Sequence, residues 1–218
     1  MLHERHLALL DADECARRAA YRRAEDSDRF ALGAVLVRLA AADALRALDP
    51  ARLEVDRRCP GCGRPHGAPR LNDSGLHLSV SHSGDRVAVA ISRWFGVGVD
   101  VEQIGCTDIP DLTHHVLGTG ESATDADEFF AYWTRKESVV KATGDGLQIP
   151  LRDVLVSPPH EPPRLRSYPG RGSLIVSMVD LRPGPGYAGT LTALTGRMPV
   201  VVEECAATLL EPVTERYG

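Results

Sequence analysis

Apolar residues recur at helical spacing in the first third of the chain. Residues 9–24 are rich in Ala, Arg and Glu and predict a first helix. A second helix is predicted by four apolar residues at i, i+3, i+4 and i+7, namely Leu32, Val35, Leu36 and Leu39. We expect Asp26 or Ser27 to cap this helix and Asp49-Pro50 to end it.

Three runs with strand character follow, at residues 76–83, 86–92 and 95–103. Gly84-Asp85 separates the first two runs and predicts a hairpin turn. The third run has valines at its odd positions, whereas its even positions hold Gly96, Gly98, Asp100 and Glu102. Successive side chains of a strand point to opposite faces, so one face packs and the other presents two carboxylates. We expect the two glycines to leave room there for a ligand.

The second half of the chain repeats this order of helices and strands. Helices are predicted at residues 111–117 and 125–143, and strands at 173–180, 187–195 and 200–204. Five prolines within residues 157–170 predict an exposed connector.

A weak internal echo accompanies this order. Leu78-Ser79-Val80-Ser81 is similar to Leu174-Ile175-Val176-Ser177, which indicates a duplicated α+β unit. We therefore expect two similar subdomains, residues 1–104 and 105–218, each with helices packed on a small, mostly antiparallel sheet.

Composition narrows the possible functions. The 218 residues are 43% hydrophobic and 25% charged, as in ordinary globular proteins. The net charge of -5 argues against a protein that wraps nucleic acid, because that task needs an excess of Lys and Arg. The apolar run at residues 7–10 is too short for a signal sequence or a membrane span. We expect a cytoplasmic monomer that binds neither nucleic acid nor membranes.

The cysteines predict no disulfide framework, because five are present, an odd number, and no export signal precedes them. Cys59-Pro60-Gly61-Cys62-Gly63, followed by His66, looks like a zinc knuckle. It has no second Cys-x-x-Cys and lacks a fourth ligand, so we favour a reduced structural loop. A zinc-binding module is the alternative.

The segment from Tyr132 to Gly144 carries the most chemistry. Helical spacing gathers an aromatic anchor, a carboxylate and two ammonium groups within one arc, on the residues Trp133, Lys136, Glu137 and Lys141. The simpler alternative is a solvated helix with a Glu137–Lys141 ion pair that contributes about 0.3–0.5 kcal/mol.

Asp100 and Glu102 favour a functional site over a solvated helix. Their side chains lie about 7 Å apart on one strand face and need solvent, a shared proton or a cation. If Glu137 joins them, three hard oxygen ligands suit Mg²⁺, which completes its shell with substrate phosphates and water. Lys136, Lys141 and the Ser81-His82-Ser83 loop then fit as partners of phosphate.

Three ordered motifs resemble those of the Sfp-type 4'-phosphopantetheinyl transferases. They are Ser81-His82-Ser83-Gly84, the run from Val97 to Glu102, and Trp133-Thr134-Arg135-Lys136-Glu137-Ser138-Val139-Val140-Lys141 with Gly144-Asp145-Gly146-Leu147. Each motif alone is weak, whereas their order and spacing together are specific.

The resemblance implies a pseudo-twofold α+β fold with coenzyme A in the cleft between the halves. The phosphopantetheine arm would move to a serine of an acyl, peptidyl or aryl carrier protein, leaving 3',5'-ADP. The implied Mg²⁺ ligands are Asp100, Glu102 and Glu137. The implied coenzyme A contacts are Ser81, His82, Lys136 and Lys141.

Two roles in catalysis follow from that assignment. Glu137 is the candidate base for the serine hydroxyl, with water held by the metal as its rival. Lys141 is the second catalytic candidate, because its ammonium offsets charge that builds on the phosphate oxygens. A Mg-dependent nucleotide pyrophosphohydrolase on the same site is the alternative function.

The chain departs from its relatives at two positions. Many relatives carry basic residues where this chain has Ala24 and Ala68. We assign Arg29 to coenzyme A in compensation, and Arg22, Arg23 and Arg70 are the other candidates.

Overall fold

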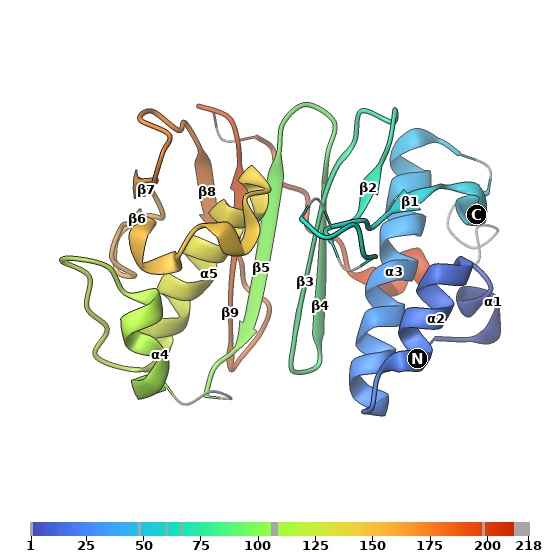
Figure 1. Ribbon diagram of the computed structural model, residues 1–218, viewed down its shortest axis with the longest axis horizontal. Helices are drawn as coiled ribbons and strands as arrows, with labels where there is room; N and C mark the ends of the chain where they lie inside the picture. Colours follow the sequence, from blue (N-terminus) through green and yellow to red (C-terminus); the bar gives the residue numbers. More distant parts are fainter. Residues whose placement is uncertain are drawn as a thin grey trace.

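The computed structural model describes residues 2–47, 49–59, 61–65, 67–105, 109–197 and 199–211, except the side chains of Pro110 and Leu147. The fold is α+β, with small antiparallel sheets at the centre and helices on either side, as predicted (Figure 1). The helices are α1 (Glu4–Leu7), α2 (Ala12–Ala20), α3 (Ala24–Leu45), α4 (Ile109–Val116), α5 (Ala126–Thr143) and α6 (Ala206–Leu210), with short 3₁₀ turns at Pro50–Arg52, Gly146–Gln148 and Leu151–Asp153. The strands are β1 (Val55–Asp56), β2 (Arg70–Leu71), β3 (His77–Ser83), β4 (Arg86–Ser92), β5 (Val97–Gln103), β6 (Leu155–Val156), β7 (Leu165–Ser167), β8 (Ser177–Asp180) and β9 (Tyr187–Ala193).

The N-terminal helices differ from the prediction at their boundaries. The helix expected at 9–24 is α2, which is shorter than predicted and begins after Asp11, because Asp11 caps it by accepting a hydrogen bond from the Glu14 N–H at 2.8 Å. The short helix α1 precedes the expected range. The buried helix α3 begins at Ala24, two residues before the expected cap at Asp26. Its apolar side chains pack on the hairpin of β3 and β4, which the predicted two-residue turn at Gly84-Asp85 joins.

The second half is built around α5. Asp125 caps it at the N-terminus, and Gly144 ends it in the left-handed conformation with φ 75°. The helix lies over the three-stranded antiparallel sheet β5-β9-β8, in which Asp100 is the register partner of Thr190. Two side-chain pairs join helix and sheet, Thr134 with Thr190 and Ser138 with Thr192.

A row of serines joins β3 to β5, which run side by side in Figure 1. The hydroxyls of Ser79, Ser81 and Ser83 accept hydrogen bonds from the backbone N–H groups of Val99, Val101 and Gln103, at 3.0, 3.3 and 3.0 Å. These side chains take the place of the backbone ladder that would join two paired strands. They therefore fix the register between the two sheets, and with it the face of β5 that meets the first half.

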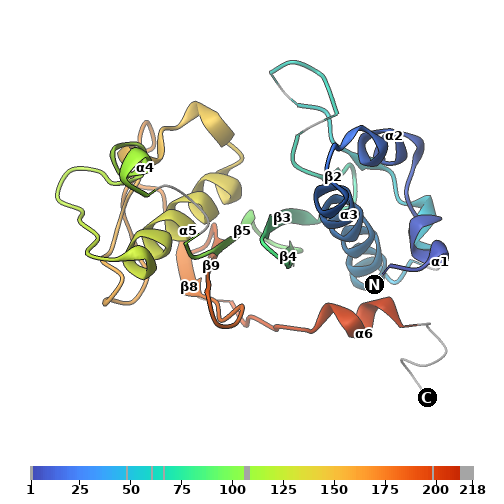
Figure 2. The same cartoon turned by 90° about the horizontal axis from the view of Figure 1, so that it is seen from below.

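Most strands lie where the sequence predicted them, but two expectations need correction. Residues 200–204 form no strand. The proline-rich connector contains β7, which pairs with β6, and the connector buries Tyr168. The division into two subdomains at residue 104 stays a prediction. Two contacts join the two parts of the chain: β5 pairs with β9, and α6 lies beneath α3 (Figure 2).

No helix in the described part of the chain is both long and apolar enough to cross a membrane.

Candidate active site

Two glycines of β5 bring α5 against the strand. A Cβ on Gly98 would lie 2.0 Å from the Ser138 carbonyl oxygen, and one on Gly96 would lie 2.8 Å from that of Ala142. The helix backbone thus fills the space in which we expected a ligand, so that expectation is wrong. The close approach instead places Glu137 and Lys141 beside the carboxylates that follow on β5.

Ser81, Asp100 and Lys141 form one hydrogen-bonded group. The Lys141 ammonium donates to Asp100 Oδ1 at 2.6 Å and to Ser81 Oγ at 3.0 Å, and Ser81 Oγ donates to Asp100 Oδ1 at 2.8 Å. Asp100 is 1% exposed, and burial raises the pKa of its carboxyl while the Lys141 charge opposes that rise. In this arrangement the Ser81 hydroxyl also accepts from Val101, so no bonding capacity remains for a phosphate.

Glu102 follows Asp100 on the same face of β5. Its Oε2 accepts a hydrogen bond from the Ser83 hydroxyl at 2.7 Å. Burial, together with the charges of Asp100 and Glu137, raises the pKa of Glu102 to about 7. Because the charges of Asp100 and Glu137 both raise the pKa of Glu102, the three carboxylates lie close enough to repel one another.

Glu137 reaches the group from α5. Burial raises the pKa of its carboxyl, and the negative charge of Asp100 raises it further, against the opposing charge of Lys141. A half-buried carboxylate with a raised pKa beside other carboxylates is typical of a catalytic or metal-binding position.

The donor set fits a hard divalent cation. Asp100 Oδ2 is buried and has no hydrogen-bond partner in the described structure. A buried carboxylate oxygen without a partner is costly, and a metal ion or a water would satisfy it. As placed, however, the described His, Cys, Asp and Glu side chains form no cluster of three or more that could ligate one ion. The Lys141 ammonium lies against Asp100 in this arrangement.

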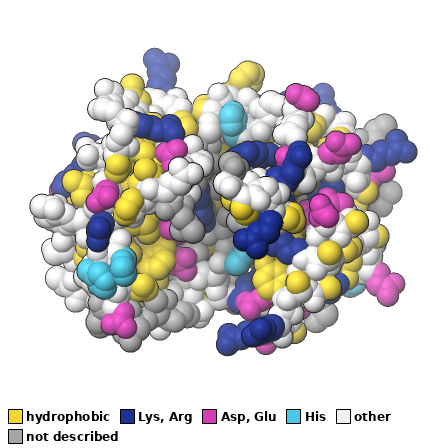
Figure 3. All heavy atoms as spheres, viewed as in Figure 1, with side chains coloured by type: hydrophobic (Ala, Val, Ile, Leu, Met, Phe, Trp, Pro, Cys, Tyr) yellow, Lys and Arg dark blue, Asp and Glu magenta, His cyan; other side chains and the backbone are white. Residues whose placement is uncertain are grey.

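His82, on β3, and Arg29, on α3, lie near each other beside this group of side chains. Burial lowers the pKa of His82, and the nearby Arg29 charge lowers it further. Arg29 extends from α3 to donate to the Gly84 carbonyl and pairs with Asp26, while its Nε is buried without a partner in the described structure. The surface is hollowed between the two halves, with Lys and Arg side chains gathered beside the hollow (Figure 3).

Comparison with known proteins agrees with this geometry. Residues 96–190 match the family described as the 4'-phosphopantetheinyl transferase superfamily. The 4'-phosphopantetheinyl transferase HetI of Nostoc sp. is 30% identical over 171 residues, which cover 74% of this chain and 71% of that protein. The chain belongs to this superfamily.

Two further relatives carry the same description. A 4'-phosphopantetheinyl transferase of Bacillus subtilis is 30% identical over 155 residues, covering 68% of this chain and 66% of its own length. The transferase Sfp of Bacillus subtilis strain 168 is 27% identical over 157 residues, with 68% and 66% covered. The matched segment of the superfamily contains β5 and α5, and therefore all three carboxylates.

Lys136 does not join the site of this transferase. Its ammonium is fully buried, pairs with Glu121 and donates to the carbonyls of Val116 and Leu151 at 2.6 and 3.2 Å. These partners lie on the side of α5 that faces α4. The expectation that Lys136 contacts a phosphate is therefore corrected: Lys136 holds α4 and the following loop to α5.

Two residues of the motifs make contacts that we did not predict from the sequence. Arg135 is 1% exposed, binds Asp180 through two nitrogens at 3.1 and 2.6 Å, and donates to carbonyls of the proline-rich connector. Ser83 holds the Glu102 carboxylate. The alternation of serines along β3 could have indicated the contact of Ser83 with β5. Nothing in the sequence indicated the partners of Arg135.

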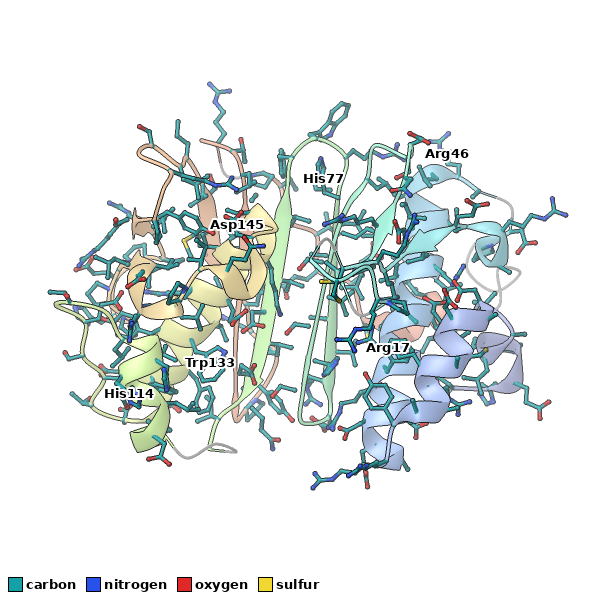
Figure 4. All side chains as sticks on the ribbon, viewed as in Figure 1. Arg17, Arg46, His77, His114, Trp133 and Asp145 are labelled. Carbon is teal, nitrogen blue, oxygen red and sulfur yellow. The ribbon has the colours of Figure 1, made fainter. Side chains whose placement is uncertain are left out.

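Trp133 is the predicted core anchor, since its ring packs against Phe129 and Phe130 at centroid distances of 5.8 and 6.2 Å (Figure 4).

The cysteine loop stays a prediction. Cys59 and Cys62 lie on a tight turn in which the Gly63 N–H donates to the Cys59 carbonyl at 2.8 Å. His66, the third residue of the knuckle, lies outside the described residues. The choice between a reduced loop and a zinc site therefore depends on metal analysis.

Proposed function

We propose that this chain transfers the phosphopantetheine arm of coenzyme A to a serine of an acyl, peptidyl or aryl carrier protein and releases 3',5'-ADP. The superfamily uses coenzyme A as its substrate. The observation that carries the proposal is the contact of Ser81, Asp100 and Lys141, which joins three motifs from three separate elements at one point. The fold itself does not require an ammonium, a hydroxyl and a buried carboxylate with one unpaired oxygen to meet between β3, β5 and α5.

Asp100, Glu102 and Glu137 are the residues that would hold Mg²⁺. Bound there, Mg²⁺ would supply positive charge to the pyrophosphate oxygens of coenzyme A. Support comes from the mutual repulsion of the carboxylates and from the partnerless Oδ2 of Asp100. Lys141 is partly exposed and contacts the group, so its ammonium is available to offset charge on the leaving phosphate.

Glu137 is our candidate base. The serine hydroxyl of the carrier protein gives its proton to this carboxylate and attacks the β-phosphorus of coenzyme A. The bond to the bridging oxygen breaks, and 3',5'-ADP leaves with that electron pair. Burial and the negative charge of Asp100 raise the pKa of Glu137, which makes its carboxylate a stronger proton acceptor than an ordinary glutamate.

His82 and Arg29 are our candidates for the remaining phosphate contacts of coenzyme A. They lie close enough for the Arg29 charge to lower the pKa of His82. Arg29 extends from α3 to the Gly84 carbonyl in the β3–β4 turn, and His82 lies near that turn on β3.

The proposal is tested with purified protein, coenzyme A, Mg²⁺ and a panel of apo carrier proteins of the three types. Mass spectrometry should find one phosphopantetheine arm on the acceptor serine of at least one carrier. A carrier with that serine changed to alanine is the control and should gain no mass.

Failure to modify any member of the panel would overturn the proposal. Release of phosphopantetheine from coenzyme A without a carrier protein, with no transfer when one is present, would instead establish a pyrophosphohydrolase.

A further inference from the structure

The serines of β3 alternate with a fixed offset from β5. Each hydroxyl accepts from a backbone N–H twenty residues later, and two of them also donate to a carboxylate nineteen residues later. Ser81 donates to Asp100 and Ser83 donates to Glu102. The same offset from Ser79 falls on Gly98, which has no side chain. Two of the three serines therefore do more than join the strands.

We propose that Ser83 is a positioning residue, which orients the Glu102 carboxylate for divalent metal binding. This inference rests on the proposed function. The Ser83 hydroxyl is fixed from one side by the Gln103 N–H at 3.0 Å, so its proton is directed toward Glu102 Oε2 at 2.7 Å. A hydroxyl held in this way selects one orientation of the carboxylate and leaves Oε1 for another ligand.

The long side chain of Glu102 explains why such a holder is needed. Asp100 is held by both Ser81 and Lys141, whereas Ser83 is the one hydrogen-bond donor recorded for the Glu102 carboxylate in the described structure. Glu102 also has more rotatable bonds than Asp100 and is less buried. Without the Ser83 hydroxyl, repulsion from Asp100 and Glu137 would turn the carboxylate away from the group.

Three variants separate positioning from simple joining of the strands. Ser83→Ala removes the donor, and Ser83→Thr keeps it on a side chain that suits a strand. Ser79→Ala is the matched control, because it removes a serine bond to β5 of the same kind but touches no carboxylate.

The measurement is Mg²⁺ binding in the presence of coenzyme A, by isothermal titration calorimetry without any carrier protein. Ser83→Ala should bind Mg²⁺ about 10-fold more weakly than wild type, the lower end of the range for an outer-shell partner of a metal ligand. Ser83→Thr should bind within about 3-fold of wild type, and Ser79→Ala should be unchanged. In transfer assays, Ser83→Ala should need more Mg²⁺ for half-maximal rate, at an unaltered KM for coenzyme A.

Equal Mg²⁺ affinity of Ser83→Ala and wild type would overturn the inference and leave the proposed transferase standing. Equal weakening in Ser79→Ala would also overturn it, because the effect would then belong to the strand contact. A wild-type protein that binds no Mg²⁺ with coenzyme A would overturn the metal site itself, and the inference with it.

Discussion

Lys141 Nζ lies 2.6 Å from Asp100 Oδ1, although 41 residues separate them. This is the one ion pair of the carboxylate group in the described structure. The ammonium offsets part of the repulsion among Asp100, Glu102 and Glu137 when no other cation is present. Removing the cation and removing one of the carboxylates should therefore change the stability of the metal-free protein in opposite directions.

Lys141→Met should lower the free energy of unfolding of the metal-free protein by about 1–3 kcal/mol, because Asp100 keeps its buried charge without the ammonium. Transfer should fall as well. Urea unfolding in the presence of a chelator measures the first effect, and mass spectrometry of a carrier protein measures the second. Arg166→Met, at an exposed ion pair, is the control and should change neither quantity much. An unchanged free energy of unfolding in Lys141→Met would contradict the pairing.

Glu137→Gln should leave the metal-free protein at least as stable as wild type. The substitution keeps the shape of the side chain and removes one charge from a repelling group, and no hydrogen bond to the Glu137 carboxylate is recorded in the described structure. Transfer should fall by about 100-fold or more, as for the loss of a general base. Circular dichroism and urea unfolding check the fold. A variant that unfolds would show that Glu137 is structural.

Gly98→Ala should push α5 away from β5. The new Cβ would lie 2.0 Å from the Ser138 carbonyl oxygen, and that oxygen belongs to helix backbone, which cannot move alone. We expect a loss of about 1–3 kcal/mol or more in the free energy of unfolding. Transfer should fall too, because Glu137 and Lys141 move with the helix. Gly172→Ala, at a glycine with nothing within 4 Å, should be neutral in both assays.

Lys136→Met tests whether Lys136 is structural. Its ammonium is 0% exposed and its partner Glu121 is 5% exposed, so the substitution strands a buried carboxylate at a cost of about 3–5 kcal/mol. Adding Glu121→Gln should recover part of that loss. The KM for coenzyme A of the folded variant should match wild type. A raised KM with normal stability would restore Lys136 as a phosphate contact.

His6 should make the protein less stable in mild acid. Burial lowers the pKa of His6 below 6.5, with Arg5 and His3 adding to this, against the hydrogen bond to the Leu210 carbonyl. The unfolded chain binds a proton at the ordinary pKa, and the folded chain resists it. The stability contribution is therefore intact above pH of about 6.5 and is lost as the pH falls below that value.

Urea unfolding of wild type and His6→Gln between pH of about 7.5 and about 5.5 tests this effect. Wild type should lose more stability on acidification than the variant. Equal losses would mean that His6 protonates in the folded state as readily as in the unfolded one.

The sequence determined the elements of the site well. Alternation along residues 97–103 placed Asp100 and Glu102 on one face of β5, because the two-residue period of a strand is a local property. The cap at Asp125 and the glycine at 144 set the limits of α5 in the same local way. The three motifs that meet in the structure were visible as sequence and indicated the superfamily.

Tertiary structure decided which of these side chains meet. Lys136 and Lys141 are five residues apart and so differ by about 140° around α5, which sends one ammonium to Glu121 and the other to Asp100. From the sequence, both were members of one wide arc, and the packing of α4 and β5 on opposite flanks of the helix decided that the two ends of that arc meet different partners. Likewise, Gly96 and Gly98 indicated that another group packs closely against the β5 backbone. The sequence did not show whether that group is a ligand or a helix. That depended on long-range burial, which a local pattern does not record.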